Sequence, residues 1–364
     1  MKKFIVAVFL SLILVAGCAE NPPSMVDGNG TLYLIAVWDS TDGAVPNAPL
    51  LPMSFAKVII LSEYGLMIRE TDGNGILFLD MLPATTYTLS ARKPNPNRPN
   101  MQIVGSKLDV LVSAGAIRRD TVFGQSFSST GIAINEVYAC GPVNSVFYFY
   151  DQYIELYNGS DSLRYLDGMM VMRFSGNGAG KGPGGDEGDD GDIDGATYEF
   201  KFPGVPGERN YPIAPRQFVV LAQDAVNHST SCAGAIDLTR ANWEFYNQFS
   251  GSDIDNPNVP NLINMRSSHT TDFFLSVTND VVVVSAGRDS NYVDGIDIVD
   301  VIDGVEYQTS SNLLKTLDRR VDRGFALSPG SYSGKSMQRR EPGSDTNDGI
   351  IDFEILNVPT PGRQ

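Results

Sequence analysis

Residues 131–158, GIAINEVYACGPVNSVFYFYDQYIELYN, decide the fold class of this chain. Residues 132–138 are rich in β-branched and aromatic side chains, and a turn that contains Gly141 and Pro142 follows them. An aromatic run then leads into residues 152–158, which have the same composition. Such segments between Gly and Pro punctuation predict a pair of β-strands rather than a helix.

The chain on the C-terminal side of this pair continues the same pattern. Strands are predicted at 163–173, 197–202, 217–222, 272–277, 280–285, 296–307 and 350–356. One short helix is predicted over 311–320, because Leu313, Leu314 and Leu317 are spaced to share one helix face. Many short strands with frequent turn signals predict an antiparallel β-sandwich.

The chain on the N-terminal side, residues 31–127, also alternates strands and turns. The predicted strands are 32–38, 57–62, 67–69, 76–79 and 82–89. The string TDGNGILFLDMLPATTYTLSA at 71–91 resembles the transthyretin-like, carboxypeptidase-regulatory type of β-sandwich, which implies a spacer or a binding module. Residues 72–75 are predicted to form a tight hairpin turn. Too few ligands follow this turn for a calcium loop.

Residues 128–364 resemble a second family at both ends. The segments that carry the resemblance are INEVY (134–138), DQYIELYN (151–158), YLDG (165–168), SMQRR (336–340) and PTPG (359–362), which are similar to the lamin-tail type of immunoglobulin-like domain. The resemblance implies a second sandwich with long inserts at 176–195 and 227–265. We therefore predict an all-β chain of two β-sandwich domains: prealbumin-like over 31–127, then lamin-tail/immunoglobulin-like over 128–364.

More closely, the whole chain resembles a group of lipoproteins from Bacteroidota that is catalogued only as a domain of unknown function. The resemblance lies in an FPG…YPI segment (202–213), an A-x-x-H segment (225–228) and a W-E…D-x-D-N-P segment (243–257). It implies no activity for this chain, because that family has none assigned.

Residues 1–17 have the layout of a cleaved export signal, in which two lysines precede an apolar run too short for a membrane span of about 20 residues. The small residues before Cys18 resemble the lipobox of bacterial lipoproteins, which implies that Cys18 is acylated and anchors the chain to a membrane. An ordinary signal peptide with an incidental cysteine is the alternative. Residues 18–30 are then a tether. Because Ala19 is not the aspartate of inner-membrane retention, we expect an outer-membrane location, at the cell surface or on the periplasmic face.

The composition excludes one class of partner. The chain carries 43 Asp and Glu against 27 Lys and Arg, a formal net charge of −16 at pH 7. Affinity for nucleic acid comes mainly from clustered Lys and Arg, so we expect no nucleic-acid partner. Cys140 and Cys232 remain once Cys18 is assigned to lipid, and they form a disulfide or stay as two free thiols.

Motifs for catalysis are scarce. The only histidines are His228 and His269, and the sequence contains no G-x-S-x-G elbow, no H-E-x-x-H and no glycine-rich phosphate loop. In the acidic insert, Asp190, Asp192 and Asp194 match the opening of an EF-hand calcium loop. The match fails further on, and a solvated acidic loop is the alternative interpretation.

A second candidate site combines aromatic and polar side chains. Its members are Trp243, Tyr246, Asp253, Asp255 and Asn256. Exposed aromatic rings beside carboxylates and amides suit stacking on a sugar ring and hydrogen bonding to its hydroxyls. The alternative is a long connection that aromatic packing and Asx turns hold in place.

Glu136 and Glu155 lie on the two strands of the opening pair, one on each. If they face the core, each carboxylate needs a partner such as Arg173 or Arg216. Paired carboxylates suit a glycosidase. Because these two occupy structural positions of the lamin-tail pattern, we interpret them as structural.

We expect a non-enzymatic binding or accessory module, with no cofactor other than the calcium considered above. Its ligand would be a glycan, a protein partner or an outer-membrane transporter, contacted through the inserts. One alternative is a surface hydrolase that uses Asp253, Asp255, Glu244 or His228. The other is a purely structural envelope component, which predicts a broad apolar patch and no pocket.

Overall fold

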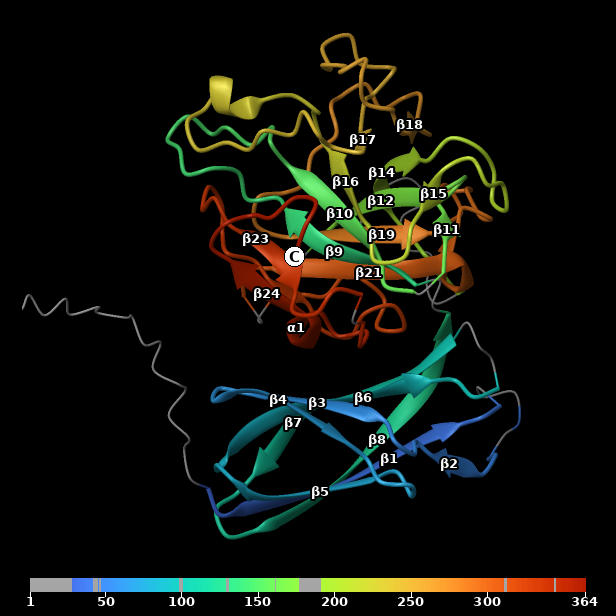
Figure 1. Cartoon of the computed structure of the whole chain (residues 1–364), viewed down its shortest axis with the longest axis vertical. Helices are drawn as coiled ribbons and strands as arrows, with labels where there is room; N and C mark the ends of the chain where they lie inside the picture. Colours follow the sequence, from blue (N-terminus) through green and yellow to red (C-terminus); the bar gives the residue numbers. More distant parts are fainter. Residues whose placement is uncertain are drawn as a thin grey trace, which may run out of the picture.

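The computed structural model describes residues 28–41, 45, 47–97, 101–128, 131–160, 162–176, 191–310, 313–343 and 345–364. The predicted export signal, Cys18, most of the tether and Asp190 lie outside these ranges. Within them the chain forms two bodies of β-structure, one after the other (Figure 1). No helix in these ranges is long and apolar enough to span a membrane. The predicted all-β fold class is confirmed.

The first body is a sandwich of eight strands. They are β1 (Gly30–Asp39), β2 (Leu50–Pro52), β3 (Lys57–Ser62), β4 (Gly65–Glu70), β5 (Ile76–Leu82), β6 (Thr85–Pro94), β7 (Met101–Val112) and β8 (Ile117–Ser128). Their order is β2-β1-β8-β7-β6-β3-β4, with β5 also paired to β1. Along β1, Leu32, Leu34 and Ala36 are fully buried and the residues between them are not. This period of two is typical of a half-buried strand.

The turn at 72–75 is capped in the way that its sequence predicts. Asp72 Oδ1 accepts hydrogen bonds from the backbone N–H groups of Asn74 and Ile76, both at 2.8 Å. Gly75 has a φ of +73°, and a Cβ there would lie 2.5 Å from the carbonyl oxygen of Ala36. The flanking strands are not partners, however, because β4 pairs with β3 and β5 pairs with β1. The predicted hairpin is therefore wrong, and the turn carries the chain to a different set of strands.

The second body contains two six-stranded sheets, of order β17-β16-β10-β9-β23-β24 and β18-β14-β12-β19-β21-β22. The first sheet consists of β9 (Ile132–Tyr138), β10 (Tyr153–Asn158), β16 (Phe218–Ala222), β17 (Trp243–Glu244), β23 (Ser336–Arg339) and β24 (Phe353–Leu356). The second consists of β12 (Met170–Ser175), β14 (Ala196–Lys201), β18 (Ile263–Asn264), β19 (Asp280–Ser285), β21 (Val301–Gln308) and β22 (Ala326–Leu327). Short pairs link β11 (Arg164–Tyr165) with β15 (Pro212–Ile213) and β13 (Asp192–Ile193) with β20 (Ile296–Asp297).

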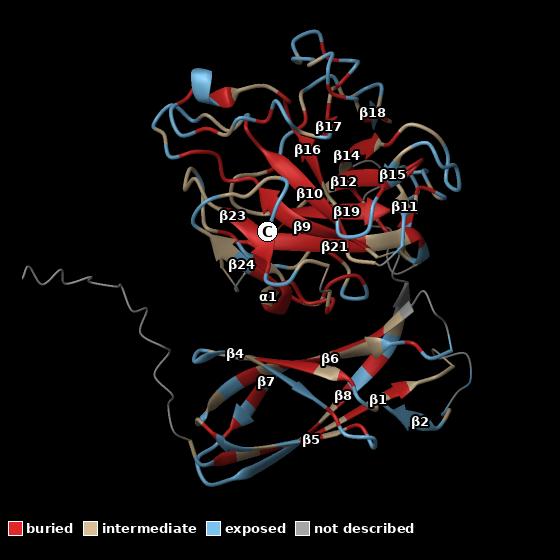
Figure 2. Ribbon diagram, in the orientation of Figure 1, coloured by how far each residue is buried: buried red, intermediate tan, exposed pale blue. Residues whose placement is uncertain are grey.

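Among the described residues of the second body, helical structure is confined to short turns, η1 (His228–Thr230), η2 (Ile298–Asp300) and α1 (Gly349–Asp352). Its main core lies between the two sheets: Ile134 and Leu156 of the first sheet belong to one buried cluster with Val171 and Val282 of the second. Strands β9 and β10 are buried along their whole length (Figure 2). The stretch that predicts the fold thus lies at the centre of this body.

Glu136 and Glu155 lie directly opposite each other across β9 and β10, and both are fully buried. Glu136 accepts a hydrogen bond from the backbone N–H of Thr360 at 3.1 Å. Glu155 accepts one from the backbone N–H of Gly362. The two glutamates therefore hold the PTPG segment at 359–362 against the sheet, which agrees with a structural role.

The other partners of these glutamates are amides and hydroxyl groups, including Ser336 and Thr360, rather than arginines. Gln338 Nε2 donates to Glu136 at 3.1 Å, and Asn135 Nδ2 donates to Glu155 at 2.9 Å. Arg173 lies beside Asp280 instead. The expectation that Arg173 pairs with one of the glutamates is wrong, because its own strand neighbour already provides a buried carboxylate.

The helix predicted over 311–320 does not form in its described part, residues 313–320. The backbone N–H groups of Thr316 and Leu317 donate to the buried carboxylate of Glu306, each at 3.0 Å. A side chain thus satisfies donors that a helix would satisfy with its own carbonyl groups. Leucine spacing alone predicted the helix, and it does not reveal this competition.

The strand predicted over 272–277 is also absent. The N–H of Leu275 donates to Gln152 Oε1 and the N–H of Ser276 donates to Asp280 Oδ2, both at 2.7 Å. These side chains replace the backbone ladder that a strand would need. The segment is consequently an irregular connection between β18 and β19.

Cys140 and Cys232 are both buried and both free. Of the two alternatives that the sequence leaves open, the structure has the free thiols and not the disulfide. Burial raises the pKa of the Cys140 thiol to about 11. Because the thiolate is the reactive form, Cys140 is expected to be chemically inert at neutral pH.

Candidate metal centre

Three aspartates converge at the end of the second body that lies away from the first, around β17 and β18 (Figure 1). Asp224 follows β16, Asp253 lies in the connection between β17 and β18, and Asp272 lies in the connection between β18 and β19. One carboxylate oxygen of each lies within 4.8 Å of the other two. We call these three residues the aspartate group.

Buried amides hold the aspartate group in place. Asn247, which is only 1 % exposed, donates its backbone N–H to Asp253 Oδ2 at 2.6 Å. Its side-chain Nδ2 donates to the carbonyl oxygen of Thr271 at 2.6 Å. Gln223 Nε2 donates to Asp272 Oδ2 at 3.1 Å. These contacts tie three separate connections together, so the group is a product of the fold and not of one loop.

The oxygens at the centre of the group have no hydrogen-bond donor. The Oδ1 atoms of Asp224, Asp253 and Asp272 are buried and have no partner in the described part of the chain. Gln223 is fully buried, donates to Asp272, and leaves its own Oε1 unpartnered. Buried acceptors without a partner cost free energy unless a proton or a cation reaches them.

Several other buried carboxylates of the second body have a cation of the protein beside them, whereas Glu136, Glu155 and Glu244 have hydrogen-bond donors instead. Arg339 lies 2.7 Å from Asp303 and 3.1 Å from Asp352. Lys315 lies 3.2 Å from Glu306 and 3.8 Å from Asp322. In the ranges that the structure describes, no Lys or Arg forms an ion pair with a member of the aspartate group. The counter-charge that the fold supplies elsewhere is therefore not supplied here by the protein.

The protonation of the group reflects this arrangement. Burial, reinforced by repulsion from Asp272 and Asp253, raises the pKa of Asp224 to about 9. Burial and the neighbouring Asp253 raise the pKa of Asp272 to about 7. The pKa of Asp253 is also raised, mainly by burial. Without a cation the group retains protons at neutral pH, and a bound cation would displace them.

The donor set fits calcium. Ca²⁺ binds oxygen ligands at about 2.3–2.6 Å, so two oxygens on one ion are at most about 5 Å apart. The oxygens of the aspartate group meet that limit. Zinc prefers nitrogen and sulfur ligands, and among the described residues the group includes neither histidine nor cysteine. Asp224, Asp253 and Asp272 would hold the ion, which would supply the missing positive charge.

Glu244 and Asn256 brace the connection that carries Asp253. Glu244 is fully buried and accepts the backbone N–H groups of Ala225 and Asn256, the latter at 3.0 Å. Asn256 Nδ2 donates to the carbonyl oxygen of Ala225 at 2.7 Å. Asp255 is exposed and accepts a hydrogen bond from Asn261 Nδ2 at 2.9 Å. The connection between β17 and β18 is therefore held in place by side-chain hydrogen bonds.

The prediction that Trp243 stacks on a sugar ring is wrong. Its side chain is 6 % exposed and packs edge-on against the rings of Phe202 and Tyr211. An indole enclosed in this way has no free face for a sugar ring. Tyr246 is partly exposed. Of the five predicted residues, Asp253 is the one that the fold brings into the aspartate group.

The predicted calcium loop at 190–194 lies partly outside the described residues, since Asp190 is not described. Asp192 belongs to β13, which pairs with β20, so it lies in a short strand rather than in a loop. Asp194 follows this strand directly. Calcium at this insert remains a prediction.

His228 connects the aspartate group to a neighbouring surface. It is 2 % exposed, and its Nε2 lies 2.9 Å from the backbone carbonyl oxygen of Asp224. Its Nδ1 lies 2.7 Å from the hydroxyl oxygen of Tyr148. Burial lowers the pKa of His228. A neutral ring with both nitrogens engaged serves as a structural link and not as a general base.

Sequence reasoning missed two members of the group. Asp224 belongs to no motif in the sequence, and Asp272 is predicted to begin the strand at 272–277. A weak signal was present, because Gln223 and Asp224 follow a continuous apolar strand and polar residues in that position often serve a site. Nothing local indicates that the three connections meet.

Comparison with known proteins supports the family prediction in part. A family model described as "Protein of unknown function (DUF4876)" matches residues 214–293, a segment that contains the whole aspartate group. The chain is similar in structure to a DUF4876 family protein from Bacteroides thetaiotaomicron, with a TM-score of 0.54 at 20 % identity over 92 % of this chain and 95 % of that one. This likeness shows a shared fold. No curated protein matches the sequence.

Two further solved structures are more distant. One is a protein from Pseudomonas aeruginosa that has been proposed to bind carbohydrate, with a TM-score of 0.20 at 14 % identity over 27 % of this chain and 89 % of that one. The other is a minor pilin of Streptococcus agalactiae, with a TM-score of 0.19 at 12 % identity over 53 % of this chain and 82 % of that one. Neither carries an argument about this chain. The prealbumin-like and lamin-tail-like descriptions of its domains remain predictions.

Proposed function

We propose that this chain is a non-enzymatic binding module of the cell envelope, anchored by lipid at Cys18, whose outer loops are organised by a calcium ion. The observation that supports it best is the aspartate group, in which one buried and two half-buried carboxylates lie together, each with an oxygen that has no hydrogen-bond partner, and with no ion pair to a described Lys or Arg. A single ion there would cross-link three connections that have little regular structure of their own.

The surface next to the aspartate group supports a protein partner rather than a glycan. The connection between β9 and β10 exposes Val143, Val146 and Phe147, each by more than 70 %. Tyr148 of the same connection is joined to the aspartate group through His228. Branched aliphatic side chains favour an apolar protein surface and do not stack on sugar rings. An outer-membrane protein such as a transporter is the partner that this reasoning favours.

Calcium titration tests the proposal. Isothermal titration calorimetry of the protein without its signal segment, after treatment with chelator, should show one calcium ion per chain. Asp253→Asn should weaken binding more than about tenfold, because it removes a ligand charge. Asp255→Asn is the matched control, since Asp255 is exposed and lies outside the group. Absence of calcium binding at millimolar concentration would reject the proposal, as would equal loss in both variants.

The hydrolase alternative is supported by one observation, the raised pKa of Asp272, which lies near 7 as a general acid or base requires. Against it, Asp224 is 3 % exposed and His228 uses both ring nitrogens in structural hydrogen bonds. A hydrolase would lose turnover in Asp272→Asn while it retained calcium-independent ligand binding. The purely structural alternative predicts no pocket, and the structure contains a cleft between its two bodies.

A further inference from the structure

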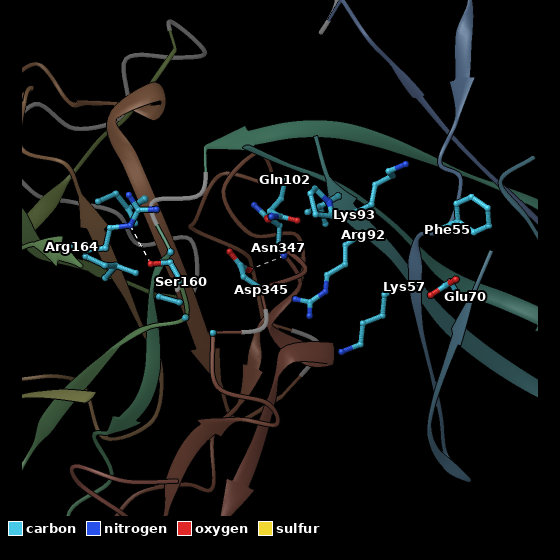
Figure 3. A pocket seen from close by; sticks show the side chains of 18 residues that line it. Phe55, Lys57, Glu70, Arg92, Lys93, Gln102, Ser160, Arg164, Asp345 and Asn347 are labelled. Atoms are coloured by element: carbon cyan, nitrogen blue, oxygen red, sulfur yellow. Dashed lines mark hydrogen bonds between the residues drawn. The ribbon is translucent and has the colours of Figure 1, made fainter. Parts of the chain in front are cut away.

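A cleft of about 490 Å³ lies between the two β-bodies (Figure 3), and none of its lining residues belongs to the aspartate group. The first body contributes side chains of β3, β4, β6 and β7, and the second contributes residues near the starts of β9 and β11 and the segment around Asp345. Arg92 and Lys57 extend from the first body toward Asp345 of the second (Figure 3). The volume lies in the range of pockets that bind small molecules.

The cleft concentrates positive charge in an acidic chain. Its walls contain Lys57, Arg92, Lys93 and Arg164, with Glu70 and Asp345 as the carboxylates. The chain as a whole has a net charge of −16. Four cations stand against these two carboxylates and Glu341, which pairs with Lys57, so the cleft is a local exception, and such a cleft attracts anions.

Two of these cations occupy an unfavourable position for the sheet itself. Lys57 of β3 and Arg92 of β6 lie directly opposite each other in the antiparallel register. Like charges in this position are destabilising. Lys57 is compensated by Glu341, with Nζ 2.6 Å from Oε2. Arg92 forms no hydrogen bond or ion pair with the described part of the chain, although its charge helps to lower the pKa of Glu341. Glu70 of β4 also lies directly opposite Lys57, so the charge left without a partner is the Arg92 guanidinium, which is available to an anionic ligand.

The remaining walls combine apolar side chains, such as Val104, Ile132 and Ile302, with polar groups and main chain. Gly159 and Gly343 approach so tightly that a Cβ on Gly343 would lie 2.9 Å from the Gly159 Cα. Ser160 and Gln102 also line the cleft. Phe55 stands at its edge with 67 % of its side chain exposed and a φ of +56°, a conformation that is strained for a bulky residue. The polar groups of these walls suit the hydroxyl groups of a sugar, and the exposed Phe55 ring suits a sugar face.

We infer that this cleft binds an acidic saccharide, with the carboxylate or sulfate of a sugar placed on Arg92 and Lys57. Arg92 would form a forked contact with the anionic group, and Ser160, Gln102 and the glycine main chain would meet the hydroxyls. Phe55 would cover one face of the ring. This saccharide site is separate from the proposed calcium site and independent of it, because the two sites lie at different ends of the second body.

Calorimetric titration with defined saccharides tests the inference. The probes are a galacturonate trisaccharide, a sulfated disaccharide and neutral maltotriose. The wild-type chain should bind at least one acidic probe and not the neutral one, and Arg92→Gln should weaken that binding about tenfold. Arg240→Gln, an equal change of charge at an exposed position outside the cleft, should leave it unchanged. The response to each acidic probe decides between a uronate and a sulfate.

Three outcomes would overturn the inference: no binding of either acidic probe, equal binding of the neutral probe, or equal affinity in Arg92→Gln and the wild type. Binding of inorganic sulfate with no acidic saccharide bound would also overturn it, because the cleft would then be an anion site only. Asp253→Asn should retain saccharide binding, so a failure of the calcium proposal can be told apart from a failure here. Thermal unfolding of each variant checks that it is folded.

Discussion

Buried carboxylates are the most informative single residues of this protein. Most of them have a protein partner, as Asp303 and Asp352 do in Arg339. Asp224 and Asp272 differ, because their nearest charged neighbours are other carboxylates. Burying negative charges together is unfavourable, so the fold must bind protons or a cation at this place. That requirement links their protonation to stability.

We predict that the aspartate group contributes less to the stability of the calcium-free protein as the pH rises from about 4 to 9. The pKa of Asp272 is about 7 in the folded protein, above its value in the unfolded chain, so the stability that it contributes is complete below the unfolded pKa and is lost as the pH rises through 7. The pKa of Asp224, about 9, extends this loss upward. Asp272→Asn should be more stable than the wild type at pH 8 by roughly 2 kcal/mol.

Urea denaturation at pH 5 and pH 8, in the presence of chelator, measures this difference. The two proteins should differ less at pH 5, where Asp272 is protonated in the folded wild type. Calcium should reverse the order at pH 8, because the ion needs the ionised carboxylate. A wild-type protein that is more stable than Asp272→Asn at pH 8 without calcium would contradict the account.

At the level of strands and connections, the local sequence pattern correctly predicted the elements that pair with other strands. The bounds of β9 and β19 agree with the predicted 132–138 and 280–285, because dense β-branched sequence is visible locally. The helix at 311–320 and the strand at 272–277 failed because distant side chains, Glu306 and Gln152, take their backbone N–H groups. The aspartate group could not be predicted for the same reason, since its members meet only through irregular connections.

The PTPG segment offers a test of such long-range contacts. Thr360 Oγ1 donates to the buried Glu136 at 3.1 Å and accepts from Gln338 Nε2 at 2.6 Å. Thr360→Val keeps the shape of the side chain but removes its hydroxyl group, so Glu136 and Gln338 each lose this hydrogen-bond partner. We expect it to lower the free energy of unfolding by about 1–3 kcal/mol. Chemical denaturation measures the loss, and Arg363→Gln, at an exposed position, is the control. Equal stability of Thr360→Val and wild type would contradict the role given to the segment.

The two sandwiches have separate hydrophobic cores. Leu34 and Ile60 belong to a buried cluster of the first body, whereas Ile134 and Val282 belong to a cluster of the second. Lys57 and Glu341 form an ion pair between the bodies, which is exposed to solvent and contributes little to stability. Each body therefore has its own hydrophobic core, and we expect it to unfold as a separate cooperative unit.

We predict two unfolding transitions in differential scanning calorimetry, of which calcium raises only one. At a concentration about 100 times Kd the ion stabilises its body by about 2.7 kcal/mol, which raises the Tm of that body by roughly 5–10 °C. The transition of the first body should stay where it is, because the aspartate group lies in the second. An equal shift of both transitions would contradict the separation of the two units.

The most direct measurement is a crystal structure of the protein grown with calcium at neutral to alkaline pH. The account predicts a calcium ion within about 2.3–2.6 Å of carboxylate oxygens from Asp224, Asp253 and Asp272, identified by its anomalous signal. Well-ordered density in which these carboxylates share protons or water, with no ion among them at millimolar calcium, would contradict it.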